Sequence, residues 1–308
     1  MTEQIYNLQY KDLLFFDVET VRSEENFDEN STSFNIWQHK NRNRENNELP
    51  ETQKTIELYK NKAALNPIFG KIVCITTGYV HNETIHLKSY TGDEKTILRD
   101  FVSMVKNSNR KLVGVNITQF DLPYTRQRFF INRLSNYLNK RQGLDVGVKP
   151  WDLEEVIVDL MKLWQGTYYY PSSLNEMCYA FGVKSPKDDI DGSQVSDAYY
   201  RGEIDRIVHY CEKDVVAVIN ILRTWREEPQ LEYEGHKEEE KLILNPDLYK
   251  NLYAAGKLTK QTKDIIKLKS QQLNKNEKEK FVTLIKAALN KDKFLKTEEK
   301  FLETILNQ

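Results

Sequence analysis

The chain has 308 residues, of which 39% are hydrophobic and 30% charged, and it carries 45 basic and 46 acidic residues. This length fits one large domain or one domain with a small appendage, and the hydrophobic share exceeds that of disordered chains. The net charge of −1 excludes a protein that is polybasic throughout, although basic residues can still gather in one segment. No apolar run approaches the ~20 residues of a membrane-spanning helix, so no membrane partner is expected.

The N-terminal residues lack the basic and apolar regions of a signal peptide. The three cysteines, Cys74, Cys178 and Cys211, are far apart and form no CxxC pair. We therefore expect buried free thiols and a cytoplasmic protein.

The first part of the chain predicts a strand, a polar insertion and a hairpin. Residues 13–18 (LLFFDV) form a short apolar run that is typical of a buried strand. Residues 22–66 are rich in Asn, Glu, Arg and Gln, and they predict an insertion that is loose in its first half and helical in its second. Residues 71–80 and 83–90 predict two strands with a tight turn at His81-Asn82.

The next part alternates between helices and strands. Apolar residues at helical spacing predict helices over 93–107, 121–138, 174–181 and 203–225, and apolar runs predict strands over 111–116 and 156–160. A hairpin followed by alternating helices and strands indicates an α/β fold around one mixed sheet.

The composition changes after Trp225. Residues 229–240 form an acidic linker, and residues 241–308 contain 15 lysines, no arginine and 8 acidic residues. Apolar residues at helical spacing predict that this tail is a small basic helical module. It is either a solvated helical appendage or a surface for nucleic-acid phosphates.

Asp17 and Glu19 stand at the end of the first predicted strand. Side chains at i and i+2 of a strand point to the same side, so two carboxylates emerge together from an apolar strand. Buried carboxylates in proximity are unfavourable, and a divalent cation would compensate them. The alternative is that the strand has ended and both acids are solvated.

Two later segments add further polar side chains. A predicted strand ends near Asn116 and a helix begins near Asp121, which is also a plain candidate for an N-cap. On the helix over 203–225, Tyr210 and Asp214 are one turn apart at the margin of the apolar stripe, so both face a cleft beside the sheet. The alternative is a tyrosine at the rim and a solvated aspartate.

The three segments occur in the order D-x-E, N-x₃-F-D and Y-x₃-D. This order resembles the DEDD superfamily of 3′→5′ exonucleases in its tyrosine-containing DEDDy branch. The similarity is to the exonuclease domain of family B DNA polymerases and to the stand-alone bacterial proteins described as predicted PolB-like 3′→5′ exonucleases. It covers about residues 12–225, including the stretches 66–75, 172–182 and 190–195. The resemblance implies an RNase H-like, mixed five-stranded sheet flanked by helices, with an exonuclease domain over 1–228.

The resemblance also implies roles for individual residues. Asp17 would bridge two divalent ions, Mg²⁺ or Mn²⁺, which hard oxygen ligands favour. Glu19 and Asp214 would complete the site of the attacking water, Asp121 would hold the second ion, and Tyr210 would orient the water. The implied substrate contacts are Thr20, Asn116 and Phe120, although Phe120 could equally be a core residue.

Two aromatic alternatives remain near these motifs. His209 and Asp214 have the H-x₄-D spacing of the histidine branch, but on a helix His209 lies about 140° from Asp214, so we prefer Tyr210. The run Tyr168-Tyr169-Tyr170 could be a base-stacking platform, or residues of a partly buried strand or loop.

Three functions remain open at this point. The first is a 3′→5′ exonuclease acting on single-stranded DNA ends, and the second is an exoribonuclease of the RNase D or oligoribonuclease type. The third is a non-enzymatic nucleic-acid-binding module, which the intact set of acids and tyrosine disfavours. Resemblance to polymerase proofreading domains favours DNA over RNA, and no polymerase region fits in the remaining ~80 residues. A proofreading role would therefore need a polymerase or repair partner on another chain.

Overall fold

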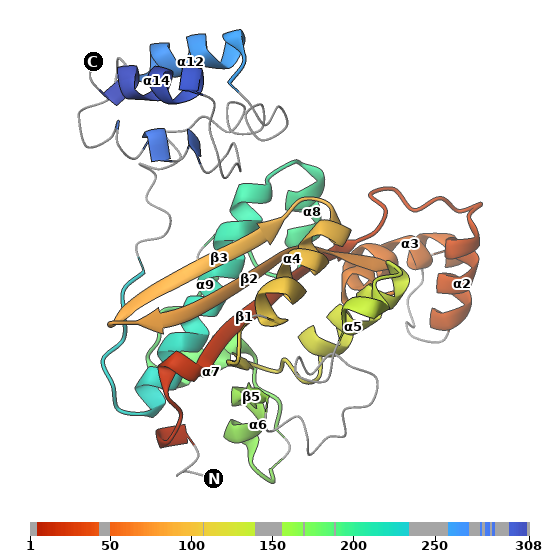
Figure 1. Cartoon of the computed structure of the whole chain (residues 1–308). Coiled ribbons are helices and arrows are strands. Elements are labelled where there is room, and N and C mark those ends of the chain that lie inside the picture. The colour runs from red at the N-terminus through yellow and green to blue at the C-terminus, as the bar shows by residue number, and fades with distance from the viewer. Residues whose placement is uncertain are drawn as a thin grey trace. The chain divides into compact units, whose positions relative to one another are not determined.

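The computed structural model describes residues 5–42, 50–106, 108–138, 156–168, 170–187, 189–233, 258–270, 278, 281–283, 285–286 and 296–306. The chain separates into two compact units, Met1–Tyr233 and Glu234–Gln308 (Figure 1).

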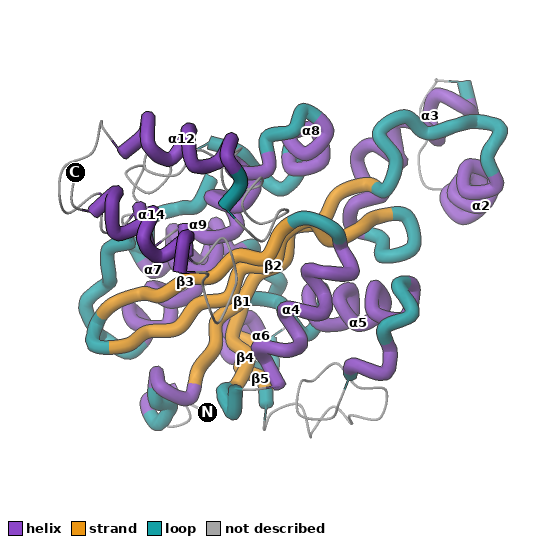
Figure 2. The backbone as a smooth tube through the Cα atoms, turned by 45° about the horizontal axis from the view of Figure 1, so that its top comes forward, coloured by secondary structure: helices purple, strands orange, loops and turns teal. Residues whose placement is uncertain are grey.

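The first unit is built on a five-stranded sheet with the strand order β3-β2-β1-β4-β5 (Figures 1 and 2). β1 pairs antiparallel with β2, which pairs antiparallel with β3, whereas β1–β4 and β4–β5 are parallel. This strand order confirms the predicted α/β fold around a mixed five-stranded sheet. The strands are β1 (Leu13–Arg22), β2 (Gly70–His81), β3 (Thr84–Thr91), β4 (Lys111–Gly114) and β5 (Ile157–Asp159).

Helices cover the sheet on both faces. Leu14 and Phe16 of β1 belong to the core under α4 (Glu94–Lys106) and α5 (Asp121–Ile131). Leu13 and Phe15 face the opposite way and share a core with residues of α7 (Leu174–Phe181) and α9 (Ile204–Trp225). Because side chains alternate along a strand, Asp17 and Glu19 fall on the face that α9 covers.

Several predicted boundaries were wrong, for reasons of backbone geometry. The strand expected over 111–116 ends at Gly114, because Asn116 adopts a left-handed φ of 63°. The helix expected over 121–138 ends at Ile131. The hairpin turn lies at Asn82 and Glu83, with φ of 49° and 55°, rather than at His81, which is the last residue of β2. Two short helices were not predicted, α6 (Leu160–Gln165) and α8 (Val195–Tyr200).

The polar insertion is more ordered than its composition suggests. The expectation that its first half is loose was wrong, because it contains α2 (Thr32–Asn41), which Ser31 caps by accepting from the Phe34 amide. α3 (Glu51–Lys62) and the short turn Ala63–Leu65 follow. A small aromatic core holds these helices together, with the ring of Phe27 stacked 3.6 Å from that of Tyr59. The members of this core are Phe27, Phe34, Trp37, Tyr59, Ala63 and Phe69.

The second unit contains α12 (Lys260–Ser270) and α14 (Lys296–Leu306). It has an apolar cluster of its own that includes Phe281, Ile285 and Leu302. Most of the acidic linker lies outside the described residues. Across the residues described in both units, no helix combines the length and the apolar character needed to cross a membrane.

Candidate active site

Asp17 and Glu19 project from β1 toward α9. Glu19 is buried, and Asp17 is half-buried. Oδ2 of Asp17 accepts from the Cys211 thiol at 3.4 Å. The β1–β2 register shifts between Glu19 and Thr20. Such a bulge bends and twists a strand locally, which re-aims the side chains around it.

Asp121 approaches from the opposite side of the site, at the first residue of α5. The N-cap of this helix is Phe120, so Asp121 is not the plain N-cap that the sequence also allowed. Its side chain is buried, and it lines the same cavity as Asp17 and Glu19 of β1.

The loop that contains Asn116 is fixed by Asp159, which the sequence analysis did not single out. The carboxylate of Asp159 accepts from the amides of Asn116 and Thr118 at 2.9 and 3.0 Å, and from the Thr118 hydroxyl at 2.6 Å. It also caps α6 by accepting from the Met161 amide at 3.0 Å. The sequence offered one indication of this role, because Asp159 is the only acid in the otherwise apolar run 156–160.

Tyr210 and Asp214 lie one turn apart on α9, and both are buried. His209 is exposed and does not line the cavity that these residues face. The helix therefore presents the tyrosine to the site and the histidine to its outer side.

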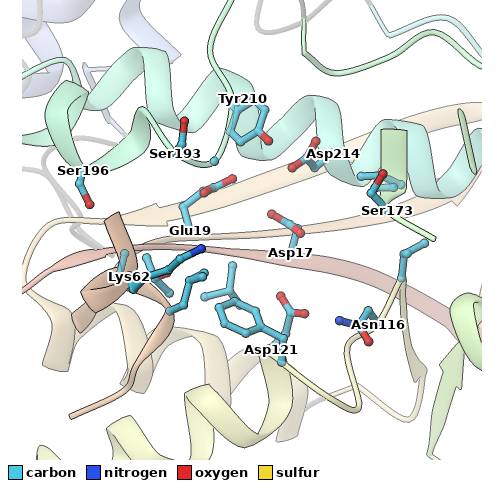
Figure 3. A pocket seen from close by; sticks show the side chains of 18 of the residues that line it. Asp17, Glu19, Lys62, Asn116, Asp121, Ser173, Ser193, Ser196, Tyr210 and Asp214 are labelled. Atoms are coloured by element: carbon cyan, nitrogen blue, oxygen red, sulfur yellow. The ribbon is translucent and has the colours of Figure 1, made fainter. Parts of the chain in front are cut away.

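These side chains meet around one cavity of about 450 Å³ (Figure 3). The four carboxylates point toward a common space between β1, α5 and α9, and the hydroxyl of Tyr210 lies beside it. All the predicted site residues line this cavity: Asp17, Glu19, Thr20, Asn116, Phe120, Asp121, Tyr210 and Asp214.

The cavity has two further walls that the sequence analysis missed. One comes from the insertion and presents Lys60 and Lys62, with the Lys62 amino group directed toward the acidic cluster (Figure 3). The other presents hydroxyl groups from the start of α7 and from the segment that leads into α8 and its first turn. These hydroxyl groups belong to Ser172, Ser173, Ser193 and Ser196. Nothing in the polar composition of residues 22–66 distinguishes these two lysines from the others.

Burial and mutual repulsion disfavour the charged forms of the acids. Burial raises the pKa of Asp17 to about 6. The pKa of Glu19 is raised by burial and then by the charges of Asp17 and Asp214. Burial and the charge of Asp17 likewise raise the pKa values of Asp121 and Asp214. Burial and the neighbouring carboxylates raise the pKa of Tyr210, so its phenol is neutral at pH 7.

This donor set fits divalent cations. Among the described residues, none of the four carboxylates forms an ion pair with a basic side chain, and the buried Oδ1 of Asp214 has no hydrogen-bond partner. One ligand atom each of Asp17, Glu19 and Cys211 lies within 4.8 Å of the others. Burial raises the pKa of Cys211, which leaves the thiol protonated as a donor to Asp17. The available ligands are therefore carboxylate oxygens, which suit Mg²⁺ or Mn²⁺.

Comparison with known proteins gives a relative and a matching family. A DNA polymerase of Archaeoglobus fulgidus is 29% identical over 132 residues, which make up 41% of this chain and 17% of the polymerase. The chain thus corresponds to a small part of that relative. Residues 64–251, more than half of the chain, match the family described as predicted 3′→5′ exonucleases related to the exonuclease domain of PolB. Because this match covers more than half of the chain, the chain belongs to the family of predicted 3′→5′ exonucleases related to the PolB exonuclease domain.

Proposed function

We propose that this protein is a 3′→5′ exonuclease of the DEDDy type that removes nucleotides from the 3′ ends of single-stranded DNA. The observation that carries the proposal is the meeting of four buried or half-buried carboxylates and one neutral phenol around a single cavity. Carboxylates alone would repel a phosphodiester, so this arrangement is productive only together with cations.

Asp17, Glu19, Asp121 and Asp214 would hold two divalent cations. When bound, such ions offset the charge of the phosphodiester and make water a better nucleophile. The chain's own contribution is to position the reacting groups. The Tyr210 hydroxyl, beside Asp214, donates to or accepts from the attacking water and aligns it with the scissile phosphorus. The water oxygen bonds to phosphorus and gives up a proton while the bond to the 3′ oxygen breaks, and the 3′ oxygen takes up a proton from solvent. The products are a 5′-mononucleotide and a strand shortened by one residue that ends in a 3′ hydroxyl.

The remaining lining residues provide the substrate contacts in this proposal. Thr20 and Asn116 border the carboxylates and are suited to hydrogen bonds with the terminal nucleotide, and the half-buried ring of Phe120 supplies an apolar contact. Lys60 and Lys62 bring positive charge to a cavity that otherwise contains only acids among its charged groups. Because phosphates attract lysine electrostatically, these residues would draw the strand along the insertion wall.

DNA is favoured over RNA because the matched relative is a DNA polymerase. The exoribonuclease alternative retains the same carboxylates and differs in contacts to the 2′ hydroxyl. Any polymerase or repair protein that works with this chain would be a separate partner.

The test uses single-stranded DNA and RNA of matched sequence, labelled at the 5′ end, with Mg²⁺ or Mn²⁺ and with a chelator as the control. We expect a ladder that shortens from the 3′ end of DNA, release of 5′-mononucleotides, and no reaction in the chelator. Faster degradation of RNA would reassign the substrate. No degradation of either strand with either metal would contradict the enzymatic proposal.

A further inference from the structure

Tyr168 and Tyr170 form an exposed aromatic pair that the proposed reaction does not use. Their exposed fractions are 74% and 61%, among the largest of the bulky apolar side chains in the described chain. Their rings are nearly parallel, with an interplanar angle of 13° and centroids 6.4 Å apart. Tyr169, which stands between them in the sequence, lies outside the described residues. Neither ring packs into a core, so the pair contributes little to folding.

This pair stands next to the wall of the catalytic cavity. Ser172 and Ser173 line that cavity, and Tyr170 precedes Ser172 by two residues. Since an extended chain spans at most ~3.6 Å per residue, the Cα atoms of Tyr170 and Ser172 are within about 7 Å. The backbone at Tyr170 therefore lies close to the wall of the site that would hold the 3′ terminus, and Tyr168 precedes it by two residues.

The loop that carries the pair is anchored at both ends. At its start, the Tyr168 amide donates to the Gln165 carbonyl at 2.9 Å, and the Gln165 side chain donates to the Tyr170 carbonyl at 3.2 Å. At its end, Ser173 and Glu176 form a capping box that fixes the first turn of α7. The backbone that carries both tyrosines is thus held in place, while the rings themselves are open to solvent.

We propose that Tyr168 and Tyr170 are a stacking platform for unpaired bases of the strand whose 3′ end enters the cavity. This inference rests on the proposed function and adds the basis of its preference for single strands. Exposed rings of parallel orientation offer faces on which bases of any sequence can stack. In a duplex these base faces are already occupied by neighbouring pairs, so a paired strand gains nothing from the platform. Tyr168 and Tyr170 act as positioning residues, since they do not touch the reacting phosphate.

The direct test is base stacking, measured without catalysis. Full-length protein is titrated with a single-stranded DNA that carries 2-aminopurine a few nucleotides from the 3′ end, with its terminal linkages made resistant to hydrolysis. We expect the wild type to quench the probe on binding, and Tyr168→Ala with Tyr170→Ala to remove the quenching and weaken affinity by about tenfold or more. Tyr168→Phe with Tyr170→Phe keeps both rings and should behave as the wild type.

Two controls separate this proposal from its alternatives. Tyr179→Ala removes another tyrosine ring, which is 89% exposed on α7, and should leave quenching and affinity unchanged. The p-nitrophenyl ester of thymidine 5′-monophosphate has no neighbouring bases, so the double alanine variant should hydrolyse it at the wild-type rate. On longer single strands the same variant should show a raised KM with kcat retained.

The outcomes are distinguishable. Unchanged quenching and affinity in the double alanine variant would overturn the platform even if the enzyme degrades DNA normally. Equal losses in Tyr179→Ala would also overturn it. If the wild type cleaves no substrate but still quenches the probe in a Tyr168- and Tyr170-dependent manner, the platform stands and the proposed catalytic function fails.

Discussion

Asp17 is the residue on which the site converges. It sits on the central strand of the sheet, and its charge raises the pKa values of Glu19, Asp121 and Asp214. Without cations, the folded protein holds four carboxylates that repel one another, and this repulsion lowers its stability. Clustered acids with raised pKa values therefore indicate a ligand-binding site.

Asp17→Asn should therefore abolish nuclease activity and stabilise the metal-free protein. The amide keeps the shape of the side chain but removes one charge from the cluster. In a chelator at neutral pH, we expect the melting temperature of the variant to exceed that of the wild type by a few degrees. Wild-type turnover in this variant would remove Asp17 from the catalytic site.

The pH dependence of this stabilisation has a defined sign. Burial raises the pKa of Asp17 from 3.8 to about 6 in the folded state, so folding disfavours its ionised form. The native state is then favoured below the unfolded pKa and loses stability as the pH rises through the folded pKa. In a chelator, the melting-temperature difference between Asp17→Asn and wild type should be small below pH 3.8 and should grow until about pH 6. A difference that shrinks over this range would contradict the burial of an ionisable Asp17.

Tyr210→Phe tests the tyrosine branch. The substitution keeps the buried ring and removes the hydroxyl that we assign to the attacking water, so kcat should fall by about a hundredfold or less. His209→Ala should change kcat only a few-fold, because His209 is exposed and outside the cavity lining. A crippling effect of His209→Ala together with a mild effect of Tyr210→Phe would assign the enzyme to the histidine branch.

At the scale of elements, the insertion forms part of the cavity that the four carboxylates line. Its aromatic core orients α3 and the turn that follows, and this places Lys60, Lys62 and Leu65 on the cavity wall. The sequence of residues 22–66 indicates only a polar insertion. In the structure, its lysines supply the positive charge among the residues that line the site.

Lys62→Ala should weaken substrate binding more than it slows the chemical step. We expect KM for single-stranded DNA to rise by roughly three- to tenfold, as for the loss of one phosphate contact, with a smaller change in kcat and a shallower salt dependence. Lys62→Arg should retain most of the affinity. Lys40→Ala, on α2 of the same insertion but outside the cavity, is the matched control and should leave KM unchanged. Equal effects of Lys40→Ala and Lys62→Ala would show that the insertion acts only through its overall charge.

The strands and the acids were predictable because they depend on local patterns. An apolar run with two acids at i and i+2 specifies both the strand and the face that carries the carboxylates, and helical spacing pairs Tyr210 with Asp214. Other features depend on tertiary packing. The aromatic core that orders α2 joins residues from Phe27 to Phe69, and the direction of Lys62 depends on that core. The backbone contacts of Asp159 involve residues more than 40 positions away, which no local pattern reveals.

At the scale of the whole molecule, charge is divided unequally along the chain. Residues 241–308 carry 15 lysines and 8 acids, and the chain totals of 45 basic and 46 acidic residues leave a net charge of −8 on residues 1–240. An acidic enzyme with a polyanionic substrate benefits from positive charge on the path of the strand. We propose that residues 1–228 form the exonuclease domain and that the basic helical module over 241–308 supplies this charge.

Deletion of residues 241–308 should therefore weaken binding to long single strands and flatten its salt dependence. Cleavage of very short oligonucleotides should be nearly unchanged, because these engage only the carboxylate site. The alternative is that the module stabilises the exonuclease domain as a helical cap. Against this, the apolar side chains Phe281, Ile285 and Leu302 are already buried in a cluster within the second unit. These side chains are therefore buried without any contribution from the first unit.

Fluorescence anisotropy with a long labelled strand, titrated with salt, decides between these two roles. Parallel melting curves of the full-length and truncated proteins are the control. If the module acts by charge, truncation lowers the slope of log affinity against log salt by roughly one for each lost phosphate contact, and the melting temperature of the exonuclease domain is retained. Equal slopes, with a lower melting temperature and lower activity on strands of every length, would show that the module is a structural cap.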